Sequence, residues 1–305
     1  GRGRDDAMNL TKYFLTTSPL DDTLGPTDMP SIWNLKKYNR GPLVKDPLCG
    51  GGKDALPLTR MNFAGDSCNA RSVIIDSALG LVGAAPPSNQ LFLSEIDWLE
   101  NYLSNYAPPK FPYPTDAAKA ASGKAIFDRE CARCHAGNLA GTVMPLTEVD
   151  QVSGKTLGTD PQRIYSWNKD AAIRANNAVR SFGIIRPGLV EANPNGYIRA
   201  FLDGIWLRAP YLHNGSVPSL RDLLTPPAQR PPMFWRGYDV YDPLDCGFVS
   251  QPGQATRVGA TWPEVLRVAT PYDIHMRSNG NGGHEWGTDL PPADKDALIE
   301  YLKTM

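Results

Sequence analysis

Residues 130–137 of the chain read ECARCHAG. Nowhere else among its 305 residues do two cysteines and a histidine stand together. In a Cys-x-x-Cys-His sequence the two thiols can add across the vinyl groups of a haem, and the histidine that follows is then held beneath the iron. The motif therefore predicts a covalent haem c, attached through the thioethers of Cys131 and Cys134, with His135 as the proximal iron ligand.

Three other interpretations of the motif stay open: a redox Cys-x-x-Cys, half of a zinc site, and plain core cysteines. A thioredoxin-like motif is expected after a strand, whereas a helix is predicted to precede this one. A zinc site needs two more ligands, and the remaining cysteines are isolated. Haem c is favoured over all three. Because haem is attached covalently on the outer face of the bacterial cytoplasmic membrane, it also predicts a periplasmic or extracellular, exported protein.

The other cysteines are Cys49, Cys68 and Cys246. In an oxidising compartment a Cys49–Cys68 disulfide would stabilise the fold by about 3 kcal/mol through the loop that it closes. Three unpaired thiols are an equally open alternative. The odd number of cysteines leaves at least one without a partner in the chain.

The amino-acid composition excludes some classes of binding partner and of protein. The chain has 31 Lys and Arg against 32 Asp and Glu, a formal net charge of −1, so neither nucleic acid nor anionic lipid is an expected partner. At 41% hydrophobic and 21% charged residues it is globular in composition and long enough for two structural units. No run reaches the about 18 apolar residues of a membrane span, which predicts no transmembrane segment. The chain starts GRGRDD, as expected of a mature, trimmed or partial protein.

The distribution of apolar residues predicts a mainly α fold with long loops and little β structure. Apolar residues recur at helical spacing over 91–103, and four prolines interrupt the pattern in 107–116. We expect a division there, into a partial N-terminal helical and loop region (1–110) and a cytochrome c-type helical domain with one covalent haem (111–305).

Within the second part, a helix capped by Thr115 or Asp116 is predicted to run into the Cys-x-x-Cys-His motif. Residues 140–290 are predicted to be mostly loop by composition, with short helices near 217–224 and 262–268. The last 15 residues form an amphipathic helical pattern that begins with proline.

The sixth iron position decides between an electron carrier and a catalyst, because an open position lets oxygen or peroxide bind. The candidates for a distal ligand are His213, His275, His284 and Met276. His213 lies in a turn-rich stretch, and His284 lies in a glycine-rich loop that could approach a flat cofactor closely. The chemistry of the residues does not choose among them.

Several stretches resemble the diheme cytochrome c peroxidase superfamily, and within it most of all the rubber-oxygenase-type diheme c-type cytochromes. They are GRGRDDAMN at the start, SIWNL around Trp33, CARCHAG, LGTDPQR (157–163), LDGIWLRAPYLHNGSVPSLRDLL (202–224) and NGNGGHEWG (279–287). The resemblance implies His135 as proximal and His284 as distal ligand. It implies a structural or near-haem role for His213, and calcium as a further cofactor without identifiable ligands here.

The chain also departs from the family pattern. Family members carry two haem motifs, and the motif of the oxygen- or peroxide-reactive haem lies N-terminal to the region seen here. By resemblance, residues 1–110 are a remnant of that first-haem domain, and the haem of this chain is the electron-transferring one. Two explanations account for the missing motif. Either an upstream segment was cleaved off, lies in another chain or was left out of this sequence, or the protein is a single-haem relative.

Further residues have a functional and a structural interpretation each. Arg163 and Arg208 could pair with haem propionates, since guanidinium groups bind carboxylates in a bidentate manner. Trp33 and Trp206 could line a pocket or relay electrons, but for each of them the role of a core residue is favoured.

Three functions follow. The first is electron transfer through a bis-histidine haem, as part of a diheme peroxidase- or oxygenase-like oxidoreductase, with a redox protein or an adjacent haem domain as partner. The second is a peroxidatic or oxygen-reactive haem with an open sixth site. The third is a non-enzymatic structural or electron-conduit subunit of a cytochrome assembly.

Overall fold

The computed structural model describes residues 4–19, 21–38, 43–44, 56–57, 59–81, 89–184, 188–190 and 195–305. Helices are the main elements of this part of the chain. The α-helices are α1 (Ala7–Leu15), α2 (Ala70–Asp76), α3 (Asn89–Asn105), α4 (Ala117–Glu130), α5 (Ala132–His135), α6 (Gln162–Tyr165), α7 (Lys169–Ser181), α8 (Leu220–Leu223), α9 (Pro252–Arg257), α10 (Trp262–Val268) and α11 (Pro292–Leu302). Short 3-10 helices cover Leu35–Tyr38, Ile205–Leu207 and Pro227–Gln229, and a π-helical turn at Ser77–Leu81 continues α2.

The strands are two to four residues long and form two-stranded antiparallel pairs. The pairs are β1 (Arg4–Asp5) with β2 (Thr27–Asp28), β3 (Leu43–Val44) with β4 (Leu56–Pro57), β5 (Val143–Pro145) with β6 (Gly196–Ile198), β7 (Met233–Arg236) with β10 (Thr270–Asp273), and β8 (Tyr241–Asp242) with β9 (Gly247–Phe248). The mainly helical fold class with little β structure is confirmed.

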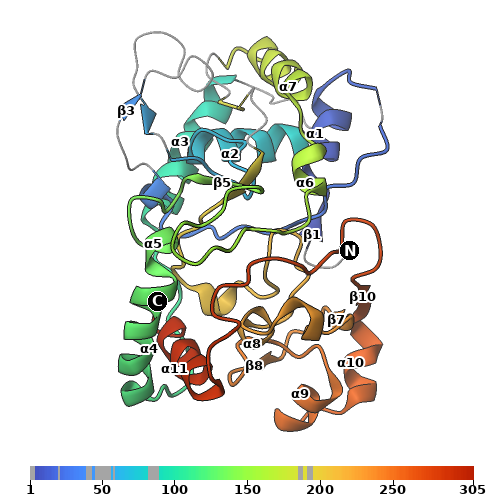
Figure 1. Ribbon diagram of the computed structural model, residues 1–305. Coiled ribbons are helices and arrows are strands. Elements are labelled where there is room, and N and C mark those ends of the chain that lie inside the picture. Colours follow the sequence, from blue (N-terminus) through green and yellow to red (C-terminus); the bar gives the residue numbers. More distant parts are fainter. Residues whose placement is uncertain are drawn as a thin grey trace.

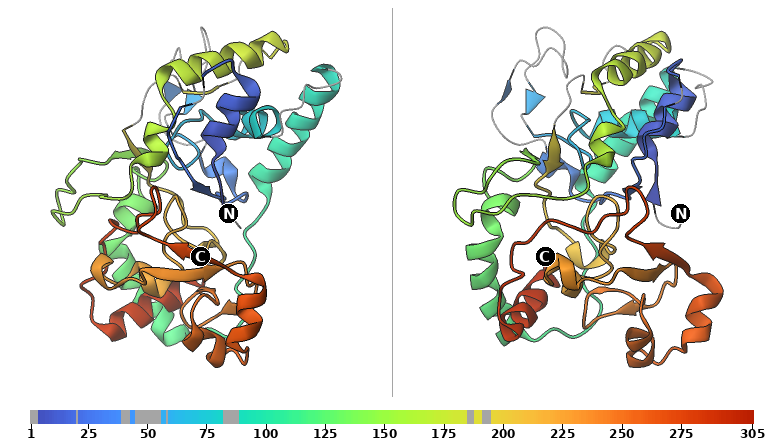
Figure 2. Two further views of the ribbon diagram at one scale, coloured as in Figure 1. Left: turned by 90° about the vertical axis from the view of Figure 1, so that its right-hand side faces the viewer. Right: turned by 45° about the vertical axis from the view of Figure 1, so that its right-hand side comes forward.

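The elements form two lobes (Figures 1 and 2). Helices α1, α2, α3 and α7 make up the N-terminal lobe, and α4, α8–α11 and strands β7–β10 make up the C-terminal lobe. The prolines of 107–116 lie in the extended segment between α3 and α4, where the division was expected. The lobes are nevertheless not contiguous stretches of chain, because α7 follows residue 110 and packs in the N-terminal lobe.

Helix α7 corrects the prediction that residues 140–290 are loops apart from two short helices. Asn168 caps it by accepting a hydrogen bond of 2.9 Å from the backbone N–H of Ala171. Its buried face consists of small residues such as Ala172 and Ala175, which pack with Met8 of α1. The two short helices that were predicted are present as α8 and α10.

Helices α4 and α11 pack against one another in the C-terminal lobe. Asp116 caps α4, as one of two predicted residues, by accepting hydrogen bonds from the N–H groups of Ala118 and Lys119. The helices cross so closely that a Cβ on Gly123 would lie 1.9 Å from the carbonyl oxygen of Ala297. The residues of the core beneath this crossing include Ile126, Phe127, Leu220, Leu298 and Ile299. This core fixes the end of α4, where the Cys-x-x-Cys-His motif begins.

Candidate haem site

The Cys-x-x-Cys-His motif forms a tight turn at the end of α4. Cys131 separates α4 from the single turn α5, and its carbonyl oxygen accepts hydrogen bonds from the N–H groups of Cys134 (3.2 Å) and His135 (3.0 Å). Both thiols are free and partly buried. Burial raises the pKa of the Cys131 thiol to about 12.

His135 is oriented by a backbone carbonyl group. Its Nδ1–H donates a hydrogen bond of 2.7 Å to the carbonyl oxygen of Ala200, since a carbonyl oxygen only accepts. This contact fixes the tautomer and leaves Nε2 free to ligate. Desolvation by the surrounding protein lowers the pKa of His135, so the ring is neutral, as a metal ligand must be.

His284 lies in the loop before α11 and is held at both ends of its backbone. Its N–H donates to the carbonyl oxygen of Leu157 (2.9 Å), and its own carbonyl oxygen accepts from Nη2 of Arg230 (3.3 Å). Its φ of +50° is in the left-handed region. Desolvation lowers the pKa of His284 to about 3, and its buried Nδ1 has no hydrogen-bond partner among the described residues.

The two histidine rings border one cavity, with their planes tilted by 45° to one another. Their centroids are 6.2 Å apart, and both rings line a cavity of about 140 Å³. Two imidazole nitrogens that ligate one metal ion from opposite sides, at about 2 Å each, place the ring centroids about 6 Å apart. The separation of the two rings therefore fits two histidine ligands of one haem iron. The chain brings these rings together from distant segments.

Asp150 joins the two histidine-bearing segments. Its carboxylate pairs with Arg133 of α5 and accepts a hydrogen bond of 2.9 Å from Nε1 of Trp286, two residues after His284. The side chain of Asp150 is 4% exposed and that of Arg133 is 43% exposed, so solvent partly screens the ion pair. Asp150 thus connects the Cys-x-x-Cys-His turn with the distal loop independently of any ligand.

The remaining candidate ligands lie in different surroundings. His213 lines the same cavity, where its ring stacks on Tyr197 with centroids 4.0 Å apart, and burial lowers the pKa of His213 to about 3. His275 is on the surface, with its side chain 74% exposed and its Nδ1 2.9 Å from an oxygen of Asp273. Met276 is exposed too. Of the four candidates, only His284 both lines the cavity and has its ring opposite His135.

Of the two arginines predicted to bind haem propionates, one lines the histidine cavity and the other does not. Arg208 lines the cavity and donates from Nη1 to the carbonyl oxygen of Phe201 (2.8 Å). Arg163 is 1% exposed, is absent from the cavity lining, and pairs with the equally buried Asp66 at 3.1 Å. A role at haem propionates therefore stays a prediction, which the placement favours for Arg208 alone.

The two tryptophans are both fixed by hydrogen bonds to backbone carbonyls. Trp206 is a buried residue whose Nε1 donates to the carbonyl oxygen of Pro109 (3.2 Å). Trp33 donates to the carbonyl oxygen of Asp203 (2.7 Å) and borders a separate, larger cavity.

The remaining predictions concern the cysteines outside the motif, other metal ions and membrane spans. Cys68 is disulfide-bonded, whereas Cys246 is free and buried; Cys49, the suggested partner of Cys68, lies outside the described residues. In the described part of the chain, no three His, Cys, Asp or Glu side chains cluster as a metal site, so the zinc alternative lacks further ligands there and calcium stays a prediction. Within the same ranges, no helix has the length and apolarity of a membrane span.

Several residues of the site are not apparent from the sequence. Arg230 is 3% exposed, and its guanidinium donates to three carbonyl oxygens of the distal loop, those of Asn281, Gly283 and His284. Burial lowers the pKa of Arg230 to about 10, so it stays charged. Arg230 donates to backbone carbonyl groups, which every residue type possesses. These contacts therefore require no particular partner residue, and no sequence pattern reveals them.

The chain is similar to one protein-family model and to two curated proteins. Residues 196–236 match the family model described as RoxA-like, cytochrome c-like. The chain is 33% identical over 242 residues, 67% of its length, to the uncharacterized protein y4iM of Sinorhizobium fredii, and 36% identical over 381 aligned positions, all of its length, to the uncharacterized protein y4iJ of the same bacterium. It spans 52% and 60% of the lengths of these two curated relatives.

The matched stretch coincides with much of the cavity wall. Residues 196–236 include Ala200, which orients His135, as well as Arg208 and His213. They also include Arg230, which holds the loop of His284. Over this stretch the chain is thus related to RoxA-type cytochromes, and the cytochrome c-like character of the matched family implies haem c as cofactor.

Proposed function

We propose that this chain is an electron-transfer unit. One haem c is bound covalently through Cys131 and Cys134, and its iron is ligated by His135 and His284. The observation that carries the proposal is the pair of opposed histidine rings, 6.2 Å apart at their centroids. When bound, the haem supplies reversible one-electron chemistry. With His135 and His284 both serving as iron ligands, the protein would leave no open iron site for oxygen or peroxide.

The chain's own residues hold this arrangement. Ala200 keeps the proton of His135 on Nδ1, and Arg230 together with Leu157 fixes the backbone of His284. Both rings stay neutral because desolvation lowers the pKa of each. We propose that the unit exchanges electrons with a redox protein or an adjacent haem domain, as part of a periplasmic or extracellular, diheme peroxidase- or oxygenase-like oxidoreductase.

The test is the mass and the ferric spectrum of the purified protein. We expect the intact mass to exceed the polypeptide mass by one haem, and the ferric spectra to be low-spin and unchanged by cyanide or peroxide. A high-spin ferric signal, or a spectrum that shifts on adding peroxide, would support a peroxidatic site instead. A mass without added haem would overturn the proposal altogether.

Replacing Gly283 by alanine should loosen the distal ligand. Its φ is +76°, and an added Cβ would lie 2.2 Å from the carbonyl oxygen of Leu157, which receives the N–H of His284. The loop must therefore shift, and we expect a substantial fraction of the ferric haem to become high-spin by EPR. The matched control is Gly282→Ala, since that Cβ would have only the oxygen of Gly158 within 4 Å, at 3.7 Å. Equal spectra for the two variants would show that the loop does not set the ligation.

A further inference from the structure

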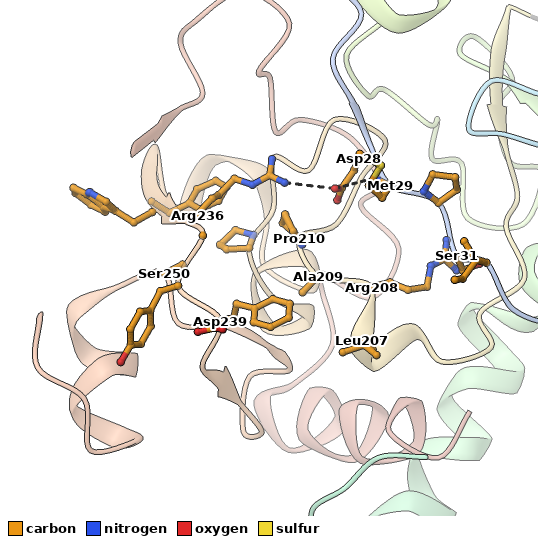
Figure 3. Close-up of a pocket in the computed structure, with 18 of the residues that line it drawn as sticks. Asp28, Met29, Ser31, Leu207, Arg208, Ala209, Pro210, Arg236, Asp239 and Ser250 are labelled. Carbon is orange, nitrogen blue, oxygen red and sulfur yellow. Dashed lines mark hydrogen bonds and ion pairs between the residues drawn. The ribbon is translucent and has the colours of Figure 1, made fainter. Parts of the chain in front are cut away.

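A second, larger cavity lies beside the histidine site and has no assigned role. Its volume is about 570 Å³, within the range of pockets that bind small organic molecules. It is enclosed by three segments: residues 28–33, residues 207–210, and residues 234–239 at the end of β7. Figure 3 shows Ala209 and Pro210 near its centre, with Arg236 and Asp28 joined along one edge.

The walls of this cavity are mostly aromatic and apolar. Five aromatic residues line it: Trp33, Phe234, Trp235, Tyr238 and Phe248. Trp33 is held rigidly, because its Nε1 donates to the carbonyl oxygen of Asp203 and its ring packs directly on Gly204, where a Cβ would approach to 2.8 Å. A wall fixed before binding lowers the entropy cost of binding a flat ring.

The charges of the lining balance one another. The cations Arg208 and Arg236 stand beside the carboxylates Asp28 and Asp239. Arg236 Nη2 is 3.5 Å from Asp28 Oδ1, and these side chains are 7% and 10% exposed. Desolvation raises the pKa of Asp28 to about 7, so at neutral pH its carboxyl group is partly protonated. The Asp28–Arg236 pair therefore offers both a donor and an acceptor to a hydroxyl group of a ligand.

We propose that this cavity binds a neutral, hydroxylated aromatic molecule, with its rings against Trp33 and Trp235 and its hydroxyl group at the Asp28–Arg236 pair. Aromatic walls favour flat rings, and moving an ionised ligand out of water into a mostly apolar cavity is costly unless its charge is fully paired. No lining residue is a predicted iron ligand, although Arg208, the arginine whose placement favours a haem propionate, lines both cavities. The cavity does share Asp28, Met29, Arg208 and Pro210 with the histidine cavity, so its occupant lies directly beside that site.

The test is calorimetric titration of the purified full chain with three matched probes. 1-Naphthol has the neutral ring system and the hydroxyl group, naphthalene lacks the hydroxyl group, and 1-naphthoate carries a charge. We expect 1-naphthol to bind with one site per chain and the other two at least tenfold more weakly. No binding of 1-naphthol, or a preference for 1-naphthoate, would overturn the proposal.

Variants locate the binding. Trp235→Ala should weaken 1-naphthol at least tenfold, whereas Trp98→Ala, at an exposed position of α3 outside the cavity, should not change it. Leu207→Trp should fill the space and abolish binding, with far-UV circular dichroism to verify the fold. Asp28→Asn should reduce the difference between 1-naphthol and naphthalene. Unchanged binding in both Trp235→Ala and Leu207→Trp would place the ligand elsewhere and contradict the proposal.

Discussion

Replacing His284 by alanine should convert the ferric haem from low-spin to high-spin almost completely. The substitution removes the ring that stands 6.2 Å from His135, and in the described part of the chain His213 is the other histidine that lines the cavity. His213 is engaged with Tyr197, so we expect it not to replace the lost ligand. The measurements are the EPR and absorption spectra of the ferric protein, in which added imidazole should restore the low-spin form.

The matched control is His275→Ala. This histidine is highly exposed and lies near Asp273, away from the cavity, so the spectrum of the variant should equal that of the wild type. A low-spin spectrum retained in His284→Ala would mean that another side chain ligates the iron. A spectral change in His275→Ala but not in His284→Ala would assign the distal ligand to His275.

The second large effect is expected at the crossing of α4 and α11. Gly123→Ala should lower the free energy of unfolding by about 3 kcal/mol, because the added methyl group would lie 1.9 Å from the carbonyl oxygen and 2.5 Å from the carbonyl carbon of Ala297. Those atoms belong to the helix backbone and cannot rotate away. Urea unfolding, followed by far-UV circular dichroism, measures the change.

A helical glycine with free space around it serves as the control for this loss of stability. Gly253 lies in α9, and a Cβ there would meet nothing within 4 Å. Gly253→Ala should leave stability unchanged or raise it by up to about 1 kcal/mol through better helix propensity. A similar loss in both variants would show that the crossing is not as close as the structure has it.

The sequence was most informative for elements whose structure depends on residues close together in the chain. The Cys-x-x-Cys-His turn, the cap at Asp116 and the last helix depend on neighbouring residues, so their patterns are visible in the chain. Helix α7 was missed because its buried face carries alanines such as Ala171 and Ala175. Small residues give a weak apolar periodicity, although Asn168 at its start is a capping signal that indicates a helix.

The pairing of His135 with His284 could not be worked out from local pattern. It depends on how the distal loop folds back onto residues 157–158, and only a family resemblance pointed to it. The partners that orient the two rings are less visible still. Ala200 and Leu157 act through backbone carbonyl groups, which every residue type possesses, so their identity leaves no trace in the sequence.

The attachment of the distal loop has a consequence for the rate at which electrons could pass. Arg230 also donates from Nε to the carbonyl oxygens of Asp222 and Thr225, at 3.2 and 3.0 Å, so one guanidinium joins the loop of His284 to the end of α8. A ligand whose backbone is held in this way moves little when the charge beside it changes. With a haem bound as proposed, a distal ligand held in this way would keep the reorganisation energy of the site low, and a small reorganisation energy would permit fast electron exchange with a partner at modest driving force.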